Sequence, residues 1–530
     1  LLGNVVYQGC FVLVLARMII PMFKTKEGGK IANLPWAMIA NIIGMVLVVG
    51  VAIFWLTIFQ AIIFPTQDHG FAQLLHNAWL RWLAVALASA VYILLNGRLL
   101  QQLNRSSLHF FYRSRLARAY VSVGNSPEGD LDGSVHRAGS NDTPRFKVSP
   151  LEESTRERTQ DTAGVTRLVN GDDICMSAYH PHRHGGPVHL VNCCINQTVD
   201  DRTGNFNADR NGIYLTVSSL GVETGTHGPV PGADGWLSRT TLAEWVAVSG
   251  AAIGSGMGSM TRPGVAALSF LTGLRLGYWQ ANLLDGAPKG PTFLSKYRAL
   301  LQEMFARFPG LRNNDWYLSD GGHFDNTGVY ALLKRKLRLI VLADCGADPD
   351  YLFADVENLV RKARIDYDAT IEFIDPASLA ALAGVQAGWF GTPDTIAPED
   401  GPEHFLLARI RYDEGPSGAL LIVKPRRSPD MPLDVAGYAG REGDFPQQST
   451  SNQFFSESEW ESYCALGTIL GAPITEAFLA RLPSWAEKGT VVGTDMASMK
   501  APVVERPRSK RIAATVGASL GIGAIATGAI

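Results

Sequence analysis

The residues from Ala37 to Phe64 form one apolar stretch without a charged side chain, and this stretch limits the possible folds of the chain more than any other feature. A helix needs about 20 predominantly apolar residues to cross the hydrocarbon core of a bilayer. Two further apolar segments, Val5 to Phe23 and Trp79 to Leu95, approach that length. Each has one arginine, Arg17 or Arg81, near an end, where a long side chain can reach the membrane surface. The sequence therefore predicts three transmembrane helices.

The basic residues in the loops predict how these helices are oriented. Lys24, Lys26 and Lys30 lie between the first two segments, whereas the residues from Pro65 to Ala78 include no Lys or Arg. Five arginines follow the third segment: Arg98, Arg105, Arg113, Arg115 and Arg118. By the positive-inside rule we expect a multi-pass membrane protein whose remaining chain is cytoplasmic. The alternative, buried helices of a soluble protein, is disfavoured by the absence of charge from the second segment.

Length and composition indicate more than one folded unit. The chain has 530 residues, of which 46% are hydrophobic and 18% are charged, and it is too long for one ordinary core. The net charge of -2 argues against a nucleic-acid-binding protein. The six cysteines include no C-x-x-C pair, so the sequence predicts neither a disulfide framework nor a zinc site. The first residue is Leu1 rather than Met, and we expect the chain to be a fragment that lacks an N-terminal part.

The pattern of polar and apolar residues divides the chain into five parts. They are a transmembrane region (1–97), an amphipathic connector (98–121), a flexible polar insertion (122–173), an α/β domain (174–485), and a tail with a small-residue apolar helix (486–530). In the α/β domain, short apolar strands alternate with helical patterns, which predicts a parallel sheet with crossover helices. Strands are expected at 186–196, 317–318, 337–343 and 369–374, helices at 329–336 and 351–364, and a hairpin at 404–412 and 418–424.

A carboxylate follows a short apolar strand and precedes two glycines in the stretch from Ser319 to Val329. A strand–turn–helix junction is where many α/β enzymes hold catalytic side chains. Asp320 is therefore a candidate general base, and Gly321 and Gly322 are candidates for the turn and for N–H groups that bind an oxyanion. The alternative is structural: Asp320 caps the following helix, and the glycines only turn the chain.

A hydrolase of this kind also needs a nucleophile, and four serines are candidates. Ser249 ends an apolar run that begins at Glu244, which resembles a strand entering a nucleophile elbow with alanines in place of glycines. Ser255 lies among glycines that could bind an anion or allow helices to pack closely. Ser519 has the literal G-x-S-x-G pattern, but no strand precedes it, and we interpret the match as chance. Ser417 belongs to the predicted hairpin turn.

Other polar residues favour structural roles. Four histidines cluster without the spacing of two ligands one helical turn apart: His180, His182, His184 and His189. No metal or other cofactor is therefore predicted. We expect His323 to serve in the turn or in packing, and Asp344 to be a structural turn acid. Asn196 begins a glycosylation sequon, which the predicted cytoplasmic side would leave unused.

The stretch from Ser319 to Gly328 resembles the D-G-G-x-x-x-N segment of patatin-like and cytosolic phospholipases. Further segments resemble a bacterial membrane-associated branch of that family: Ser107 to Arg118, Gly186 to Asn192, Ala247 to Ala252 with Met257-Gly258, and Arg409 to Tyr412 with Val423-Lys424-Pro425. The resemblance covers most of residues 100–470. It implies a patatin-like α/β fold and ester hydrolysis by a Ser-Asp dyad without histidine, in which Asp320 would be the base.

The family also has motifs that this sequence lacks. A glycine-rich oxyanion segment and a G-x-S-x-G nucleophile are expected before the strand at 186–196, and neither occurs there. The resemblance thus implies a nucleophile upstream of Leu1, and it implies that Ser249 falls in a later packing segment. The expected function is hydrolysis of acyl esters of membrane lipids, which are the expected substrate and partner. One alternative is an inactive membrane-anchored scaffold. Another is a membrane transporter or sensor, which is disfavoured because the apolar segments contain so few polar groups.

Overall fold

The computed structural model describes residues 36–65, 77–121, 173–199, 210–225, 227–231, 236–284, 292–382, 387–396, 400–449 and 455–492. The chain divides into two compact units, Leu1–Phe324 and Asp325–Ile530, and each has its own sheet. The mixed α/β class expected from the sequence is confirmed. The boundary between the units lies inside the range 174–485, which the sequence suggested as one domain. The predicted helix at 5–23, nearly all of the insertion 122–173 and most of the tail 486–530 lie outside the described residues.

The first unit has a six-stranded sheet in the order β4-β3-β2-β1-β6-β5. Its strands are β1 (Val191–Asn196), β2 (Gly212–Ser218), β3 (Gly221–Thr224), β4 (His227–Pro231), β5 (Tyr278–Ala281) and β6 (Asp315–Asp320). Every pair in this sheet is antiparallel, so the predicted parallel sheet is wrong for this unit. Only Ser219 and Leu220 join β2 to β3, and so short a connection can link only antiparallel strands.

Helices of the first unit cover this sheet and extend away from it. They are α2 (Trp36–Ile63), α4 (Ala78–Asn96), α5 (Gln101–Arg105), α6 (His109–Leu116), α8 (Leu242–Ser249), α9 (Pro263–Thr272) and α10 (Ser295–Met304). Shorter turns are η2 (Ala117–Val121), η5 (Pro181–His184), η6 (Gly310–Arg312) and η7 (Gly321–His323). Helix α8 packs against β1 and β6, and α6 packs against α8. Large buried side chains such as Trp245 and Trp316 fill the core between them, which holds β6 firmly as far as Asp320.

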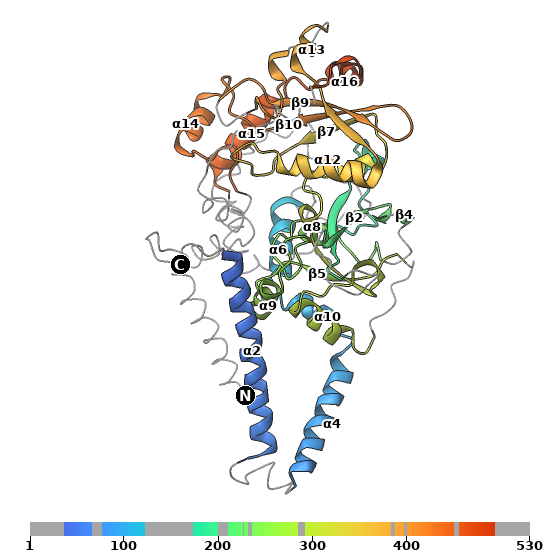
Figure 1. Cartoon of the computed structure of the whole chain (residues 1–530), viewed down its shortest axis with the longest axis vertical. Coiled ribbons are helices and arrows are strands. Elements are labelled where there is room, and N and C mark those ends of the chain that lie inside the picture. Colours follow the sequence, from blue (N-terminus) through green and yellow to red (C-terminus); the bar gives the residue numbers. More distant parts are fainter. Residues whose placement is uncertain are drawn as a thin grey trace, which may run out of the picture. The chain divides into compact units, whose positions relative to one another are not determined.

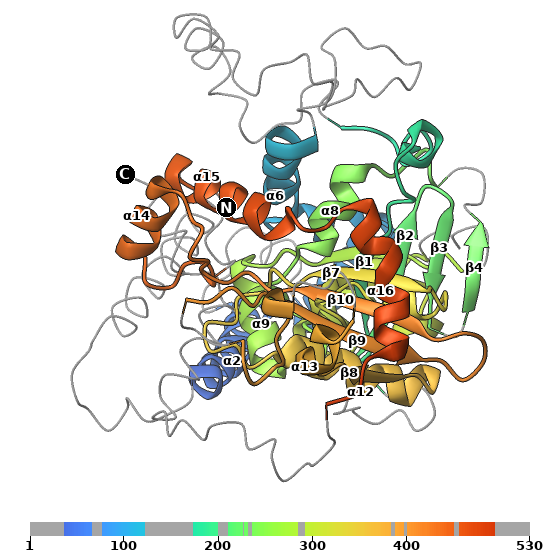
Figure 2. The same cartoon turned by 90° about the horizontal axis from the view of Figure 1, so that it is seen from above.

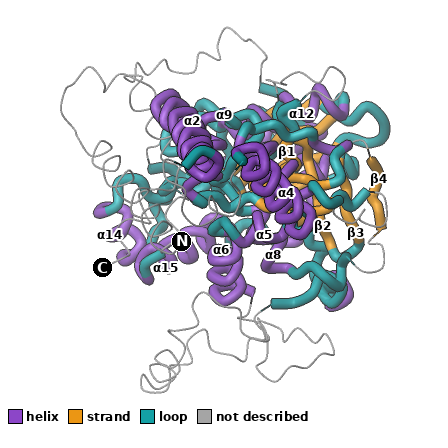
Figure 3. Tube along the Cα trace, turned by 90° about the horizontal axis from the view of Figure 1, so that it is seen from below, coloured by secondary structure: helices purple, strands orange, loops and turns teal. Residues whose placement is uncertain are grey.

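Helices α2 and α4 are long and apolar enough to cross a membrane, and they coincide with the second and third predicted segments. Helix α2 packs against α9, and Figure 3 shows the two side by side. The contact is close because a Cβ atom at Gly44 would overlap the carbonyl oxygen of Gly264. Helix α4 ends at α10, where the backbone N–H of Lys296 donates to the carbonyl oxygen of Gly97 at 2.8 Å. Each of the two helices therefore packs at one end against the first unit (Figure 1).

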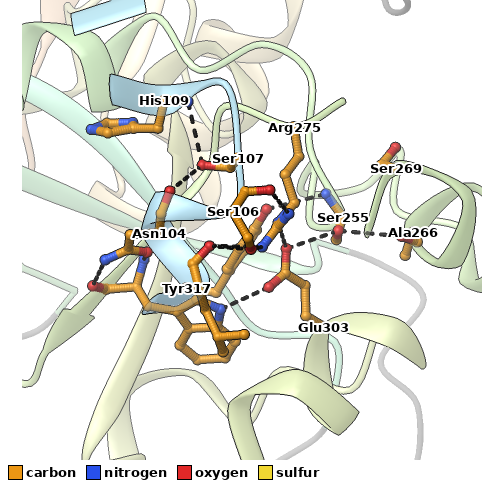
Figure 4. A network of polar contacts seen from close by, with 12 residues as sticks. Asn104, Ser106, Ser107, His109, Ser255, Ala266, Ser269, Arg275, Glu303 and Tyr317 are labelled. Atoms are coloured by element: carbon orange, nitrogen blue, oxygen red, sulfur yellow. Dashed lines mark hydrogen bonds and ion pairs between the residues drawn. The ribbon is translucent and has the colours of Figure 1, made fainter. Parts of the chain in front are cut away.

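Residues 98–121 pack into the first unit through a buried polar network (Figure 4). The Arg275 guanidinium donates to Ser106 Oγ at 3.0 Å and forms a buried ion pair with Glu303. Trp279 Nε1 and Ser255 Oγ also donate to the Glu303 carboxylate, at 2.9 and 3.1 Å. Both buried charges are thus paired and hydrogen-bonded, which burial of a charge requires. The segment that follows the apolar helices is thereby fixed to the sheet.

The second unit has a four-stranded sheet in the order β7-β10-β9-β8 (Figure 2). Its strands are β7 (Leu339–Ala343), β8 (Thr370–Phe373), β9 (Phe405–Arg411) and β10 (Gly418–Val423). The predicted hairpin is confirmed, since β9 and β10 pair antiparallel. Among the described strands, parallel pairing is confined to β7 and β10. The helices are α11 (Tyr330–Leu333), α12 (Ala354–Tyr367), α13 (Pro376–Ala380), α14 (Leu433–Arg441), α15 (Glu457–Gly471) and α16 (Glu476–Lys488), with a short turn η8 (Ala387–Trp389). Helix α16 packs against β9 and β10, and α12 packs against β8.

Candidate functional site

Asp320 is the last residue of β6, a strand paired on both sides. It lies opposite Cys193 of β1, and its backbone N–H donates to the carbonyl oxygen of Ala251 at 3.2 Å. The chain then turns sharply through η7. Gly321 is required there because a Cβ atom would lie 2.6 Å from the carbonyl oxygen of Asn192. The predicted strand and two-glycine turn are therefore confirmed. The short 3-10 turn η7 follows directly, and the helix expected at 329–336 is the single turn α11.

The Asp320 carboxylate uses one oxygen for structure and leaves the other open. Oδ1 accepts a hydrogen bond from the backbone N–H of Gly322 at 2.7 Å, so Asp320 does cap the following turn. Oδ2 has no hydrogen-bond partner among the described residues. Because Gly322 already donates to Asp320, its N–H is not available for an oxyanion, and the turn is the role that the geometry shows for the two glycines.

The half-buried setting changes the acidity of Asp320. Burial raises the pKa of this carboxyl from 3.8 to about 6, against the opposing effect of the Gly322 hydrogen bond. A carboxylate with this pKa is ionised at neutral pH, and it binds a proton more readily than an ordinary aspartate. A general base acts best when its pKa lies near the working pH. Asp320 therefore has both an open oxygen and a suitable pKa.

Tyr112 of α6 is a neighbour of Asp320 that no sequence pattern distinguishes. Burial and, secondarily, the nearby charge of Asp320 raise the pKa of its phenol to about 12. A Cβ atom at Gly250 would lie 2.6 Å from the Tyr112 hydroxyl, so the phenol lies against the turn that follows α8. Three elements distant in sequence thus meet at Asp320: α6, the turn at Gly250 and the end of β6.

Ser249 does not lie on a nucleophile elbow. The segment that was expected to be a strand forms the helix α8 instead. Thr241 Oγ1 caps the first turn of this helix by accepting a hydrogen bond from the Glu244 N–H. Ser249 is the last residue of this helix, where free carbonyl groups rather than N–H groups face outwards. Such a position offers no backbone donors for an oxyanion. The residues that follow Ser249 do contact Asp320, through the carbonyl oxygen of Ala251.

The other candidate serines are placed differently. Ser255 is buried, and both the Glu303 carboxylate and the carbonyl oxygen of Ala266 lie within hydrogen-bond distance of its single hydroxyl proton donor, at 3.1 and 3.2 Å from Oγ. It therefore packs the core and has no access to a substrate. Ser417 lies in the turn between β9 and β10, as expected. Ser519 lies outside the described residues.

His323 is a packing residue, as predicted. Its Nε2 lies 3.2 Å from the carbonyl oxygen of Ala252, and its Nδ1 lies 2.8 Å from Ser319 Oγ. The carbonyl can only accept, so Nε2 carries the proton and Nδ1 accepts from Ser319. Burial lowers the pKa of His323 to about 4, which keeps the ring neutral. Both ring nitrogens are engaged, so the imidazole is not free to serve as a base.

Asn196 connects these elements, although the sequence suggested only an unused sequon. Its side chain is buried, and its Nδ2 donates to Ser319 Oγ at 2.9 Å and to the carbonyl oxygen of Tyr317 at 3.2 Å. Its Oδ1 accepts from the backbone N–H of Gly258 at 3.0 Å. Asn196 thus links β1, β6 and the loop before α9. No local sequence pattern distinguishes such a residue, because its partners come from distant segments.

The remaining polar clusters show no second site. In the part of the chain that the structure describes, no group of three or more His, Cys, Asp or Glu residues could hold a metal ion. Asp344 follows β7 and forms a buried ion pair with Lys424 at 3.0 Å, which is the structural role expected for it.

The chain was also compared with known proteins. No family model, curated protein or solved structure matches it. The features of the chain that bear on its function are therefore the geometry around Asp320, the two apolar helices, and the short motifs that resemble the patatin-like family.

Proposed function

We propose that this protein is a lipid acyl-ester hydrolase of the phospholipase or lysophospholipase type, with a patatin-like Ser-Asp dyad in which Asp320 is the base. The observation that carries the proposal is the Asp320 carboxylate itself. It has one oxygen without a partner among the described residues, and burial holds its pKa at about 6. The resemblance of the surrounding D-G-G segment to patatin-like enzymes gives the reaction class. The antiparallel sheet of the first unit lends the patatin-like fold no support.

In the proposed reaction, a serine hydroxyl attacks the ester carbonyl while Asp320 accepts its proton. The tetrahedral intermediate collapses, the acyl–oxygen bond breaks, and Asp320 returns the proton to the leaving alcohol. Water then attacks the acyl-enzyme with Asp320 again as base, which releases the fatty acid and restores the serine. No metal ion takes part in these steps.

We place the nucleophilic serine upstream of Leu1 in a longer protein, with Ser249 as the alternative. Ser249 lies in the right region, because Ala251 accepts a hydrogen bond from the backbone of Asp320. Its position at the C-terminal end of α8 argues against it, since the helix dipole there disfavours the negative charge of a developing oxyanion.

The two apolar helices indicate where the substrate would come from. Helices α2 and α4 both begin or end on the unit that holds Asp320. A membrane anchor on the catalytic unit would let an acyl chain enter the site from the bilayer without crossing bulk water. In this proposal the units lie on the cytoplasmic side, as the loop charges predict.

Labelling with a fluorophosphonate probe tests the nucleophile. The probe is applied to the 530-residue chain, to its Ser249→Ala variant, and to the protein extended upstream of Leu1. We expect an adduct only in the extended protein, on a serine before Leu1. An adduct on Ser249, lost in Ser249→Ala, would move the nucleophile to α8. Absence of any adduct in all three proteins would reject the hydrolase.

A second function, an inactive membrane-anchored scaffold, is favoured by one observation. Asp320 Oδ1 caps η7, so the carboxylate has a structural use that does not require catalysis. The two functions differ in what Asp320→Asn does, because an asparagine keeps the cap but cannot accept the serine proton.

A further inference from the structure

Helix α10 exposes apolar side chains where a surface helix normally exposes polar ones. Its inner face consists of Ser295, Ala299 and Glu303, which are buried at the spacing of one helical turn. The opposite side and the flanking residues form what we call the α10 patch: Phe293, Leu294, Leu301 and Phe305. Phe293 is 49% exposed and Leu301 is 51% exposed. A cluster of large exposed apolar side chains beside one another marks a surface that binds something apolar.

The α10 patch lies where an apolar helix leaves the unit. The backbone N–H of Lys296 donates to the carbonyl oxygen of Gly97, directly after the last residue of α4. A Cβ atom at Gly97 would overlap the carbonyl oxygen of Phe293, so the two segments touch. In Figure 1, the upper end of α4 lies beside α10. The start of the patch is therefore fixed at the end of α4.

Helix α2 buries Ala40 and Gly44 where it packs against α9, and it buries no residue from Met45 to Ile62. Ala40 is 8% exposed against α9, whereas Val46, beyond the contact at Gly44, is 64% exposed. From Met45 to Ile63 the helix would span about 28 Å at 1.5 Å per residue. The 19 residues of α4 give the same length, about 28 Å. Both agree with the roughly 30 Å hydrocarbon core of a bilayer.

These lengths set the membrane boundary at Gly44 on α2 and at Gly97 on α4, and Gly97 contacts Phe293 and Lys296 at the start of α10. The charges around α10 are consistent with a position at this membrane boundary. Lys296 lies on the helix and Arg307 follows it, whereas Arg298 is paired with Asp315, and the acid of the helix, Glu303, is buried in an ion pair with Arg275. Basic residues beside exposed Phe and Leu are typical of a helix that lies in the headgroup layer and prefers anionic lipids.

We propose that α10 is an interfacial helix, whose patch inserts into the headgroup layer of an anionic phospholipid membrane. The inference depends on α4 spanning that membrane, but it does not require ester hydrolysis. It deepens the proposed function, because it would hold the unit with Asp320 against the leaflet that contains the substrate. Phospholipid rather than a protein is the occupant we assign, since the patch continues directly from the end of an apolar helix of membrane-spanning length.

Depth-dependent quenching tests this proposal without any measurement of turnover. An environment-sensitive fluorophore is attached to a cysteine introduced by Leu301→Cys or Phe293→Cys. The matched control is Leu220→Cys, because Leu220 belongs to the same unit and is similarly exposed, at 55%, in the tight turn between β2 and β3. Background labelling is removed by Ser at Cys10 and at the non-buried positions Cys175, Cys345 and Cys464.

The labelled proteins are reconstituted into vesicles of phosphatidylcholine and phosphatidylserine that carry a nitroxide near the headgroup or deep in the acyl chain. We expect the shallow nitroxide to quench the probes at 301 and 293 at least threefold more than the probe at 220. We also expect this difference to shrink in vesicles without phosphatidylserine. Equal quenching at 301 and 220 would overturn the proposal, and so would stronger quenching at 301 by the deep nitroxide. Failure of the hydrolase assay would leave this result unaffected.

Discussion

Replacing Asp320 by asparagine should make the protein more stable at alkaline pH and catalytically inactive. The side chain keeps its shape, and its carbonyl oxygen can still accept the hydrogen bond that Asp320 Oδ1 takes from Gly322 at 2.7 Å. What the substitution removes is the negative charge that burial disfavours. An enzyme that holds a destabilised carboxylate for catalysis gains stability when the carboxylate is lost.

The raised pKa of Asp320 sets the size of the expected change in the free energy of unfolding. The pKa is about 6 in the folded protein against 3.8 for an ordinary aspartate. A difference of about two pH units corresponds to about 3 kcal/mol. Between pH 4 and 6 the unfolded chain has lost this proton while the folded protein keeps it, so the unfolded state binds fewer protons and stability falls as the pH rises. Above about pH 6 the ionised carboxylate destabilises the folded protein by this full amount, which then no longer changes with pH. Burial of the asparagine amide offsets part of the gain, which leaves about 1 to 2 kcal/mol.

The assay is thermal unfolding in detergent micelles at pH 4.5 and pH 8, with lipid-ester turnover measured on the same preparations of the extended protein. At pH 8 we expect Asp320→Asn to raise the Tm by about 2 to 8 °C over the parent, and at pH 4.5 we expect a much smaller difference. Turnover should fall at least about 100-fold, as loss of a general base requires. A lower Tm at pH 8 would refute the reasoning, because it would mean that the ionised carboxylate stabilises the fold. Turnover equal to that of the parent would exclude Asp320 as the base.

Asp325→Asn is the matched control, five residues further along the same segment. Asp325 Oδ1 accepts from the backbone N–H and the hydroxyl of Thr327, and Oδ2 accepts from the backbone N–H of Tyr330. An asparagine offers only one carbonyl oxygen, so at least one of these donors loses its partner. We expect Asp325→Asn to lower stability by about 1 to 2 kcal/mol at both pH values, opposite in sign to Asp320→Asn at pH 8.

Three further predictions follow from the same geometry. Gly44→Ala should lower the Tm because the added Cβ would overlap the backbone of α9. Gly50→Ala is the control: nothing lies within 4 Å of the added Cβ, and the higher helix propensity of alanine should raise the free energy of unfolding by up to about 1 kcal/mol. Equal Tm values for the two variants would contradict the packing of α2 against α9. The kcat/KM for a monomeric ester, measured in the extended protein from pH 4 to 8, should rise through about pH 6 as Asp320 ionises, and a flat profile would exclude it as the base. Asn196→Ala should lower the free energy of unfolding by about 2 to 4 kcal/mol, because it leaves Ser319 and two backbone groups without their buried partner; a change within 0.5 kcal/mol would contradict its linking role.

Features that depend on neighbouring residues could be predicted from the sequence. The apolar runs became α2 and α4, because an unbroken apolar stretch of sufficient length specifies a helix of that length. The strand and glycine turn at Asp320 and the hairpin of β9 and β10 were found because their signals, short apolar runs beside glycine, are local. The prediction of a strand before Ser249 was wrong, because a short apolar run bounded by small residues fits a buried strand and a buried helix equally well.

The sequence by itself determined that this chain has long apolar helices, mixed α and β elements, and an aspartate at the end of a buried strand. Only the tertiary structure decided how the strands pair, since β1 lies between β2 and β6 through contacts that join distant residues. It also decided the acidity of Asp320 and the partner of its carboxylate. The pKa of about 6 comes from burial within a unit that brings residues as distant in sequence as Tyr112 and Ala251 close to Asp320. Periodicity and turn signals are properties of a few consecutive residues, whereas desolvation and strand order exist only when the whole unit is assembled.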